Sequence, residues 1–548
     1  MLARISTVLA AALFSVIGAA AAAADPPKIE RLFPPGGQIG STVTAKVIGA
    51  GGDGDLQVWS DRQQLHPAFN EKRDEVTITI PQDAAPGLHR LRFWNQHGST
   101  AVRPFVVGLL PEATETEAGN NVEDAIKIDQ MPVTMNGVLE KNQDVDVFAV
   151  SLKQGTTFVA SVQAHPDLGS PMDASLQLLN AEGTVIASND DDHGNDPLIA
   201  FPVTHDTTAF VRIFAFPASP DSSIRLASGA NYVYRLTLTD GPFIDHVVPP
   251  IVARSGQSAE IVGWNLDSAA VQIQTPPFEG DRTRLHGLSG LALQLRASGI
   301  EGNVRTEDVK NSPIVLPMAI GGVISAKGEI DEFSFDRKKD QKVLIRVSAA
   351  ELGSQLDPVL TLIAPDGKIL KEVDDQNKDN VDAELDIALK SDGRYRLTIQ
   401  DRFASGSWRH FYVLMMEESR PDFDATVGDG EFVLSTDKDL EIPVTIIRLR
   451  GFQNKITVTA TGLPEGVTAA PVVSEKEGDS TKKVTLKITG TQKQPSWSGP
   501  IRIICQPESD LTPRTATLAV KDTRDRVNDL WLTVLPRNPD ESAQEPSP

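Results

Sequence analysis

The sequence predicts an all-β protein built as a tandem array of β-sandwich domains. Segments such as 76–80, 232–238 and 484–488 alternate along their length, are rich in β-branched residues and end in turn signals, a pattern typical of strands. The 41 glycines and 37 prolines are spread along the chain and suit many short connections. Because 548 residues are too many for one hydrophobic core, several domains are expected.

The first 24 residues predict a signal peptide. Arg4 precedes an apolar run over residues 8–14, and a tract of small residues ends with Ala22-Ala23-Ala24. This order of a charged region, a short apolar region and an A-x-A cleavage pattern predicts that the mature chain starts at Asp25. An N-terminal membrane anchor is the alternative, and the short apolar run disfavours it. We therefore expect a secreted, periplasmic or cell-surface protein without a transmembrane segment in the mature chain.

The net charge of the chain argues against some classes of partner. Its cysteine count excludes an internal disulfide as a source of stability. The formal net charge of −22 repels phosphate backbones, which argues against nucleic acid as a partner and disfavours anionic lipid. Cys505 is the single cysteine and lies in a strand-like run, where it is most simply a small buried apolar residue. An exported chain without an internal disulfide needs another source of stability, and bound calcium is one candidate.

Residues 25–110 form the first expected domain. Its opening, Phe33-Pro34-Pro35-Gly36-Gly37, leads into a strand. The same Pro-Pro opening recurs with Pro250, 215 positions after Pro35, which predicts a two-domain repeat and a second such domain over residues 242–311. In the placement of their turns, these segments resemble the immunoglobulin-like (IPT/TIG-type) domains of bacterial extracellular proteins.

Residues 111–241, between these two domains, carry a set of short motifs. In chain order they are Glu117-Ala118-Gly119-Asn120-Asn121, Asp144-Val145-Asp146-Val147-Phe148, an Asp-x-x-Leu-x-Leu strand from Asp173, the turn Asn189-Asp190-Asp191 and a closing strand with Tyr232 and Tyr234. This set resembles the bacterial pre-peptidase C-terminal domain, a small β-sandwich appended to secreted proteases and collagenases. The resemblance implies a pre-peptidase C-terminal-like sandwich here.

A second, degraded copy of these motifs covers residues 312–418. Its matching residues lie 184 or 185 positions after those of the first copy, with Asp331, Phe333, Asp357, Asp374 and Tyr395 aligned with Asp146, Phe148, Asp173, Asp190 and Phe210. The copy lacks the Glu-x-x-Asn-Asn lead-in and has Glu329 in place of Asp144. A third immunoglobulin-like domain is expected over residues 419–536, followed by a disordered tail over 537–548.

The first copy also predicts a calcium site. Calcium takes six to eight oxygen ligands, and in the collagenase members of the family, acids of the lead-in and of the strand bind it together. The resemblance implies a metal site made by Glu117, Asn120, Asn121, Asp144 and Asp146, with Glu123 or Asp124 as additional ligands. The alternative is a turn beside a solvated strand edge. The acidic run 189–196 lacks the EF-hand spacing and favours a hairpin turn.

The functional expectation is a non-catalytic protein. The sequence contains no H-E-x-x-H, paired-cysteine or G-x-S-x-G motif, although a triad assembled from distant residues stays open. We expect an exported, calcium-stabilised binding, adhesion or scaffold protein shaped as a rigid rod. The alternative is a polysaccharide- or protein-fibre-binding accessory module of an extracellular hydrolase system, with Trp408 and Trp497 as candidate exposed aromatics. A peptidase-related enzyme is the third possibility.

Overall fold

The computed structural model describes residues 25–535, apart from 116–118, 142, 193, 219–224, 253–257, 267–271, 275–281, 287–291, 298–303, 307–311, 377–379, 436–437, 491–495, 522 and 524. The described residues form almost only β-strands, arranged as five successive pairs of sheets along the chain. We name these pairs the first to fifth sandwich. The all-β, tandem-sandwich fold class expected from the sequence is thereby confirmed. In the described part of the chain, no helix is long and apolar enough to cross a membrane.

The first sandwich pairs a four-stranded and a five-stranded sheet around its own core. Its strands are β1 (Lys28–Phe33), β2 (Gly36–Gln38), β3 (Thr42–Ala50), β4 (Gln57–Ser60), β5 (His66–Phe69), β6 (Glu75–Thr79), β7 (Gly87–Asn95), β8 (Gly98–Ser99) and β9 (Arg103–Gly108). The sheets have the orders β1-β3-β6-β5 and β2-β9-β7-β4, with β8 paired to β7. Alternate residues of both sheets, among them Leu32, Ile78 and Phe93, fill the space between them.

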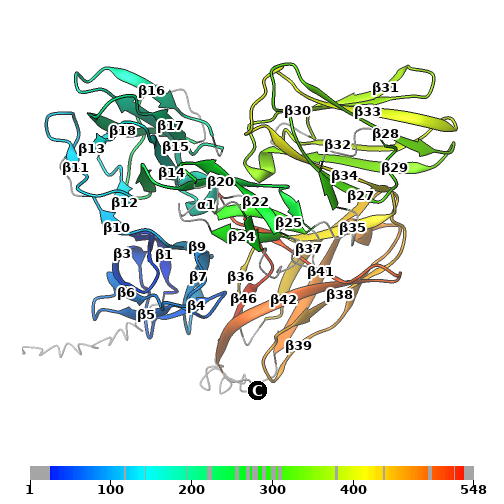
Figure 1. Ribbon diagram of the computed structural model, residues 1–548. Coiled ribbons are helices and arrows are strands. Elements are labelled where there is room, and N and C mark those ends of the chain that lie inside the picture. Colours follow the sequence, from blue (N-terminus) through cyan, green and yellow to red (C-terminus); the bar gives the residue numbers. More distant parts are fainter. Residues whose placement is uncertain are drawn as a thin grey trace, which may run out of the picture.

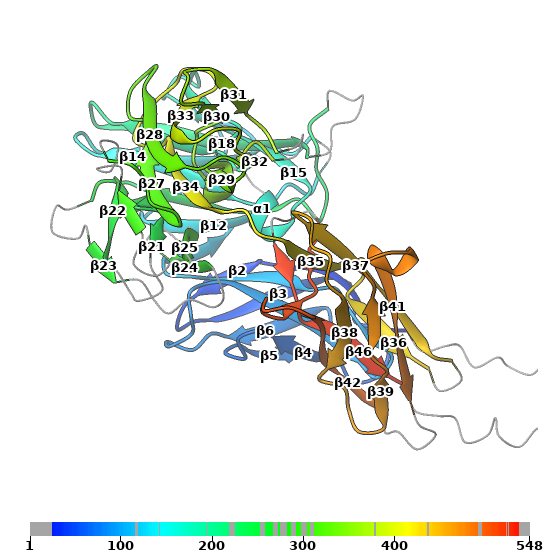
Figure 2. The same ribbon diagram turned by 90° about the vertical axis from the view of Figure 1, so that its right-hand side faces the viewer.

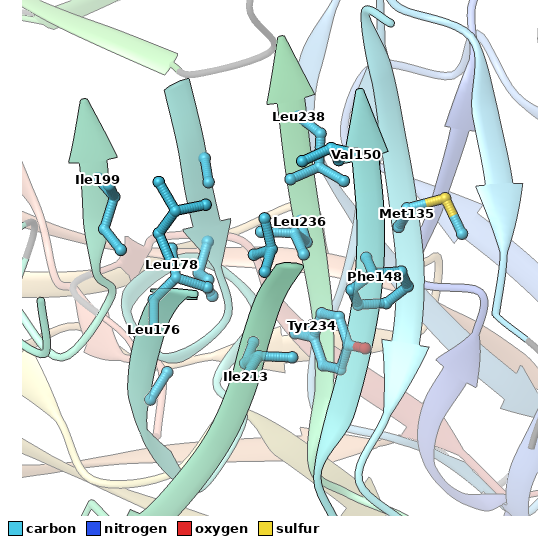
Figure 3. Packing of buried hydrophobic residues seen from close by; sticks show 14 of the residues in the cluster. Met135, Phe148, Val150, Leu176, Leu178, Ile199, Ile213, Tyr234, Leu236 and Leu238 are labelled. Carbon is cyan, nitrogen blue, oxygen red and sulfur yellow. The ribbon is translucent and has the colours of Figure 1, made fainter. Parts of the chain in front are cut away.

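The second sandwich pairs two five-stranded sheets. Its elements are β10 (Glu112–Thr114), β11 (Ile126–Lys127), β12 (Val133–Val138), β13 (Asp146–Leu152), β14 (Thr157–Gln163), α1 (His165–Leu168), β15 (Met172–Leu179), β16 (Val185–Asn189), β17 (Leu198–Pro202), β18 (Thr207–Pro217) and β19 (Val233–Thr239). The sheet orders are β10-β12-β19-β14-β17 and β11-β13-β18-β15-β16. Figure 3 shows residues of both sheets, such as Phe148, Leu176 and Tyr234, packed between them.

The third sandwich is the smallest. Its strands are β20 (Phe243–Val248), β21 (Ile251–Val252), β22 (Ser258–Trp264), β23 (Gln272–Gln274), β24 (Arg282–His286) and β25 (Ala292–Ala297). They form two three-stranded sheets with the orders β20-β22-β23 and β21-β25-β24.

The fourth sandwich repeats the strand order of the second. Its elements are β26 (Val304–Thr306), β27 (Met318–Val323), β28 (Ile330–Arg337), β29 (Lys342–Ser348), the 3-10 helix η2 (Ala350–Leu352), β30 (Pro358–Ile363), β31 (Ile369–Val373), β32 (Ala383–Ala388), β33 (Gly393–Asp401) and β34 (Phe411–Glu418). The order β26-β27-β34-β29-β32 matches that of β10-β12-β19-β14-β17. The order β28-β33-β30-β31 matches β13-β18-β15-β16.

Strand pairing corrects one detail of the sequence alignment between these two sandwiches. Val150 pairs with Ala209 in the second sandwich, and Phe335 pairs with Tyr395 in the fourth. Because Phe335 lies 185 positions after Val150, Tyr395 is the counterpart of Ala209. The alignment of Tyr395 with Phe210 is therefore wrong by one residue, which in a strand would have turned the tyrosine to the other face.

The fifth sandwich closes the chain. Its elements are β35 (Asp422–Val427), β36 (Glu431–Leu434), β37 (Leu440–Leu449), β38 (Ile456–Thr461), β39 (Val467–Ala469), β40 (Val472–Ser474), the 3-10 helix η3 (Asp479–Thr481), β41 (Lys483–Gly490), β42 (Trp497–Pro507), β43 (Arg514–Thr515), β44 (Leu518–Ala519), β45 (Arg526–Val527) and β46 (Leu530–Val534). The main sheets have the orders β35-β37-β41-β39 and β36-β46-β42-β38-β40. Cys505 lies on β42 with no exposed surface, in the core between these sheets.

The chain folds back so that the fifth sandwich packs against the first. The ring of Trp531 lies 5.9 Å from that of Trp59 and 5.8 Å from that of Trp94, measured between centroids. Arg92, which has no exposed side-chain surface, pairs with Glu431 at 2.8 Å. Figures 1 and 2 both show the blue first sandwich beside the orange and red fifth one. The rigid rod expected from the sequence is therefore wrong.

Apolar clusters also join the neighbouring sandwiches. Leu88 and Val106 of the first sandwich pack with Val138 and Leu168 of the second. Ile251 of the third packs in the same way on the fourth. The fourth-sandwich side of this contact includes Val323 and Leu352, which lie 185 and 184 positions after Val138 and Leu168. The interface between the first and second sandwiches thus has a counterpart between the third and fourth.

Candidate functional site

The segment between β10 and β13 carries the residues predicted to bind metal. β10 runs parallel to β12 in one sheet, and β11 runs parallel to β13 in the facing sheet. The chain therefore passes from one sheet to the other between β10 and β11, and Gly119 lies against the start of β13. Gly119 holds this crossing, since its carbonyl accepts a hydrogen bond of 2.6 Å from the amide of Val147. Its φ of +113° and the closeness of Ile126 leave no space for a larger residue.

The structure brings Asn120 and Asp144 together. When the side-chain amide of Asn120 is oriented to satisfy its neighbours, its nitrogen donates to Asp144 Oδ1 and to the carbonyl of Val145, both at 3.0 Å. Asp144 also accepts from the amide of Lys141 at 3.2 Å. It lies before β13, which begins at Asp146. Asp144 therefore belongs to the turn before β13, and of the two aspartates only Asp146 lies on the strand.

Of the other residues predicted to bind metal in the lead-in, Asn121 and Asp124 are described by the structure and Glu117 is not. Asn121 stabilises its own turn, with its side-chain oxygen accepting from the amide of Glu123 at 3.0 Å. Asp124 Oδ1 accepts from the amide of Asn121 at 3.1 Å. Glu117 lies outside the described residues. Asn121 is thus placed beside Asn120 but uses its oxygen within the turn.

Asp146 is buried and forms a carboxyl pair with Glu115. Its Oδ2 accepts from the hydroxyl of Tyr234 at 2.6 Å, and its side chain shares a hydrogen bond with Glu115. Glu115 Oε1 in turn accepts from the amide of Val138 at 2.7 Å. Burial, followed by the negative charge of Asp146, raises the pKa of Glu115 to about 9. The charge of the buried Asp146 therefore disfavours ionisation of the half-buried Glu115 beside it.

Glu115 is the residue that the sequence analysis missed. It lies two positions before Glu117, directly after β10, so the spacing Glu-x-Glu was the available signal. Together with Asp144 and Asp146 it gives three carboxylates at one junction, and hard oxygen ligands of this kind suit calcium. Within the described part of the chain, no three His, Cys, Asp or Glu side chains are arranged to hold a metal ion. Calcium binding stays a prediction, and Glu117 is part of it.

The acidic residues that follow β16 contact other residues of the same chain. Asp196 caps the start of α1, accepting from the amides of Ala164 at 2.6 Å and His165 at 2.8 Å. Asp192 pairs with Arg409 of the fourth sandwich. His193 lies outside the described residues. These contacts agree with a structural turn, and the corresponding run in the fourth sandwich likewise places Asp374 against Arg402.

The candidate sugar-binding tryptophans lie at contacts between elements. Trp408 is 39% exposed and stacks on His246 of the third sandwich, with ring centroids 5.5 Å apart. Its ring also meets the edge of Trp264 at 5.1 Å. Trp497 is partly buried against the core of the fifth sandwich. Neither ring forms part of a flat exposed aromatic platform.

One serine and one histidine lie within hydrogen-bond distance near the end of β33. Ser407 Oγ and His410 Nδ1 are 2.8 Å apart. The nearby carboxylate of Asp401 accepts from the backbone amides of Asp357, Phe403 and Ser405. Ser407 Oγ also accepts from the amide of Arg409 at 3.1 Å. This geometry is that of a hydrogen-bonded turn, and in it the acid is occupied by the backbone instead of orienting the imidazole.

The comparison with known proteins bears on the second sandwich. Residues 144–215 match the family model of the bacterial pre-peptidase C-terminal domain. A probable subtilase-type serine protease of Deinococcus radiodurans is 36% identical over 76 residues, which cover 14% of this chain and 10% of the protease. The chain thus spans a tenth of the length of that curated relative. The resemblance noted in the sequence is confirmed for this one segment.

Solved structures match over most of the chain, with low similarity. The insect immune protein hemolin is 8% identical with a TM-score of 0.23, covering 94% of this chain and 100% of that one. Immunoglobulin domains 1–4 of sidekick-1 are 10% identical with a TM-score of 0.22, covering 93% and 99%. These TM-scores are too low to support an argument about the arrangement of the domains or about function.

Proposed function

We propose that the protein is an exported, non-catalytic binding scaffold whose second sandwich is stabilised by calcium at the lead-in. The observation that carries this proposal is the contact between the carboxyl groups of Glu115 and Asp146, with the charge of Asp144 near enough to raise the pKa of Glu115 further. Two carboxyl groups in contact disfavour each other's ionisation and a nearby cation favours it, and calcium accepts such ligands. Glu117 and the side-chain oxygen of Asn120, turned toward the ion, complete the proposed ligand set.

The proposal also treats the fourth sandwich as a second pre-peptidase-like copy and the first, third and fifth as immunoglobulin-like domains. The shared strand order of the second and fourth sandwiches supports the duplication. The fourth sandwich keeps the buried pair of Asp331 and Tyr412, with 2.5 Å between the carboxylate and the hydroxyl. In place of Asp144 it has Glu329, whose Oε2 accepts from Ser325 and Ala326 in its own loop. We therefore assign calcium to the second sandwich alone.

Calorimetry of the full mature chain tests the calcium proposal. Calcium at a hundred times its dissociation constant is expected to stabilise the second sandwich by about 2.7 kcal/mol relative to chelator, and titration calorimetry should give one site per chain. Asp144→Asn should abolish the shift. Glu329→Gln, the matched change in the fourth sandwich, should leave it intact. An unfolding curve that is the same in calcium and in chelator overturns the proposal.

An accessory role in an extracellular hydrolase system is the second candidate. It is supported by the segment of 76 residues that is 36% identical to part of a probable subtilase-type serine protease. The test is incubation of the purified chain with casein and with gelatin. Absence of cleavage supports both the scaffold and the accessory role, because both are non-catalytic. Cleavage that a serine-protease inhibitor blocks overturns both.

A further inference from the structure

A cavity of about 540 Å³ lies on the second sandwich, beside the lead-in. Its floor is the outer face of β13 and β18, where Arg212 and Phe214 alternate with the core residues Val211, Ile213 and Ala215. One wall is the lead-in turn and the other is the turn between β15 and β16. The residues that line the cavity are Asn120, Asn121, Val122, Glu123, Val145, Val147, Leu179, Ala181, Glu182, Gly183, Arg212, Phe214 and Leu226. Ligand pockets commonly have volumes of about 300–1,000 Å³.

Arg212 brings a cation to this floor. Its Nε donates to Gln177 Oε1 at 2.9 Å, and Nη2 donates to the same oxygen. Among the residues that the structure describes, no carboxylate lies within ion-pair distance of Arg212. The half-buried and buried arginines Arg90, Arg92 and Arg409 each pair with at least one carboxylate. Since a guanidinium carries five N–H donors, Arg212 keeps donors for a ligand.

The other polar groups of the cavity set the chemistry of that ligand. Glu123 and Glu182 supply acceptors, and the side-chain nitrogen of Asn121, whose oxygen accepts from the amide of Glu123, supplies donors. Two glutamates disfavour an anionic ligand, and Arg212 disfavours a cationic one. A neutral polyhydroxyl ligand fits this mixture because each hydroxyl donates one hydrogen bond and accepts others.

The apolar part of the floor fits the carbon face of a sugar ring. Phe214 lines the cavity and packs edge-on against Phe216, with 6.0 Å between ring centroids. Val147 and Leu226 extend the apolar surface. A peptide bound by main-chain pairing needs a free strand edge. Beside the cavity, the amide of Val147 on the edge of β13 already donates to Gly119, and the next residues pair with β11. The cavity therefore lies over the face of a sheet and is closed to that mode of recognition.

We propose that this cavity binds a neutral saccharide, with Arg212 and the flanking carboxylates and amides hydrogen-bonding its hydroxyl groups and Phe214 packing on its C–H face. The proposal rests on the binding-scaffold function and names its ligand class and its site. It requires no calcium in the cavity itself. The lead-in residues Asn120 and Asn121 join the two sites.

Affinity electrophoresis of the full mature chain tests the proposal. Gels contain one neutral polysaccharide each, such as a mixed-linkage β-glucan, xylan or mannan, with alginate and gelatin as the anionic and protein comparisons. At least one neutral polysaccharide should retard the chain. Phe214→Ala and Arg212→Lys should each weaken that retardation about tenfold or more, the latter because an ammonium lacks the planar fork of the guanidinium.

The matched control is Phe403→Ala, which removes a ring that is 74% exposed on the fourth sandwich and should change nothing. Unfolding temperatures equal to that of the wild type show that the variants are folded. Retardation that Phe403→Ala abolishes and Arg212→Lys spares overturns this site but leaves a binding scaffold. Retardation by alginate or gelatin alone overturns the saccharide class. The calcium-dependent stabilisation described above decides the calcium proposal separately.

Discussion

Arg409 joins three sandwiches through one guanidinium group. Its Nη1 and Nη2 donate to Asp192 of the second sandwich at 2.8 and 2.5 Å, and its Nε donates to Asp245 of the third at 3.1 Å. Trp264 and Trp408 cover the group. Burial alone would lower the pKa of Arg409, but hydrogen bonds and charge from the two aspartates raise it above its usual value. The arginine is therefore charged throughout the accessible pH range.

Replacing Arg409 tests whether this junction stabilises the molecule. Arg409→Ala leaves two buried carboxylates without their guanidinium, and the expected cost is about 3–5 kcal/mol of unfolding free energy, measured by urea denaturation. Arg402→Ala is the matched control from the same loop. Its ion pair with Asp374 is 43% exposed on the arginine side, so its loss should cost less than about 1 kcal/mol. Equal effects of the two variants would contradict the assignment.

Cys505 gives a second prediction at the scale of the residue. Burial, followed by the charge of Asp424, raises the pKa of its thiol to about 12. Because the thiolate is the reactive form, the native chain should resist a thiol reagent such as DTNB at pH 8. One thiol per chain should react once the protein is unfolded in guanidinium. Rapid labelling of the native protein would show that β42 opens or that the thiol of Cys505 is not buried.

Strands β19 of the second sandwich and β34 of the fourth each place a tyrosine opposite a glycine of the neighbouring strand. Tyr234 stands opposite Gly137 across the strand pair, and Tyr412 stands opposite Gly322. A Cβ on Gly137 would lie 2.1 Å from the ring of Tyr234, and one on Gly322 would lie 2.3 Å from that of Tyr412. Each ring thus occupies the space over a glycine, and each hydroxyl reaches a buried aspartate of the facing sheet.

Removal of either hydroxyl should destabilise its own sandwich. Tyr412→Phe takes the donor from buried Asp331 and is expected to cost about 1–3 kcal/mol, read from the shift of one calorimetric transition. Tyr234→Phe should have a comparable effect on the second sandwich. Tyr232→Phe is the matched control for Tyr234→Phe, because Tyr232 lies in the same segment and is only partly buried. Stability unchanged in Tyr412→Phe would mean that water replaces the hydroxyl.

The strands and their order can be predicted from local sequence, whereas their register and their contacts cannot. Alternation of apolar residues predicts the strands, and the offsets of 184 and 185 predict two sandwiches with one strand order. Register is set by partners far along the chain, so Tyr395 was aligned one position off. The metal-site prediction brought Asn120 and Asp144 together but missed Glu115. The spacing Glu-x-Glu pointed to Glu115, but its contact with Asp146 arises only because β10 and β13 lie in facing sheets.

At the scale of the whole molecule, the closed arrangement rests on outward-facing aromatic residues. Leu530, Leu532 and Val534 point into the core of the fifth sandwich, whereas Trp531 between them faces the first sandwich and is only 2% exposed. The sequence shows this alternation but not what covers the outer face. Arg90 adds an ion pair with Asp525, 435 positions away in the chain. Contacts at such separation cannot be inferred from strand periodicity.

Opening of this closed arrangement can be measured. Trp531→Ala removes the ring that packs on Trp59 and Trp94, and a buried aromatic at the centre of an interface is worth at least about 2 kcal/mol. Combined with Arg92→Ala, it should separate the first and fifth sandwiches and increase the maximum dimension in small-angle X-ray scattering. Trp497→Ala is the control, because Trp497 packs against the core of its own sandwich and should lower stability without changing the dimension. An elongated wild-type particle, or a double variant that scatters as the wild type does, would show that these contacts do not hold the chain closed.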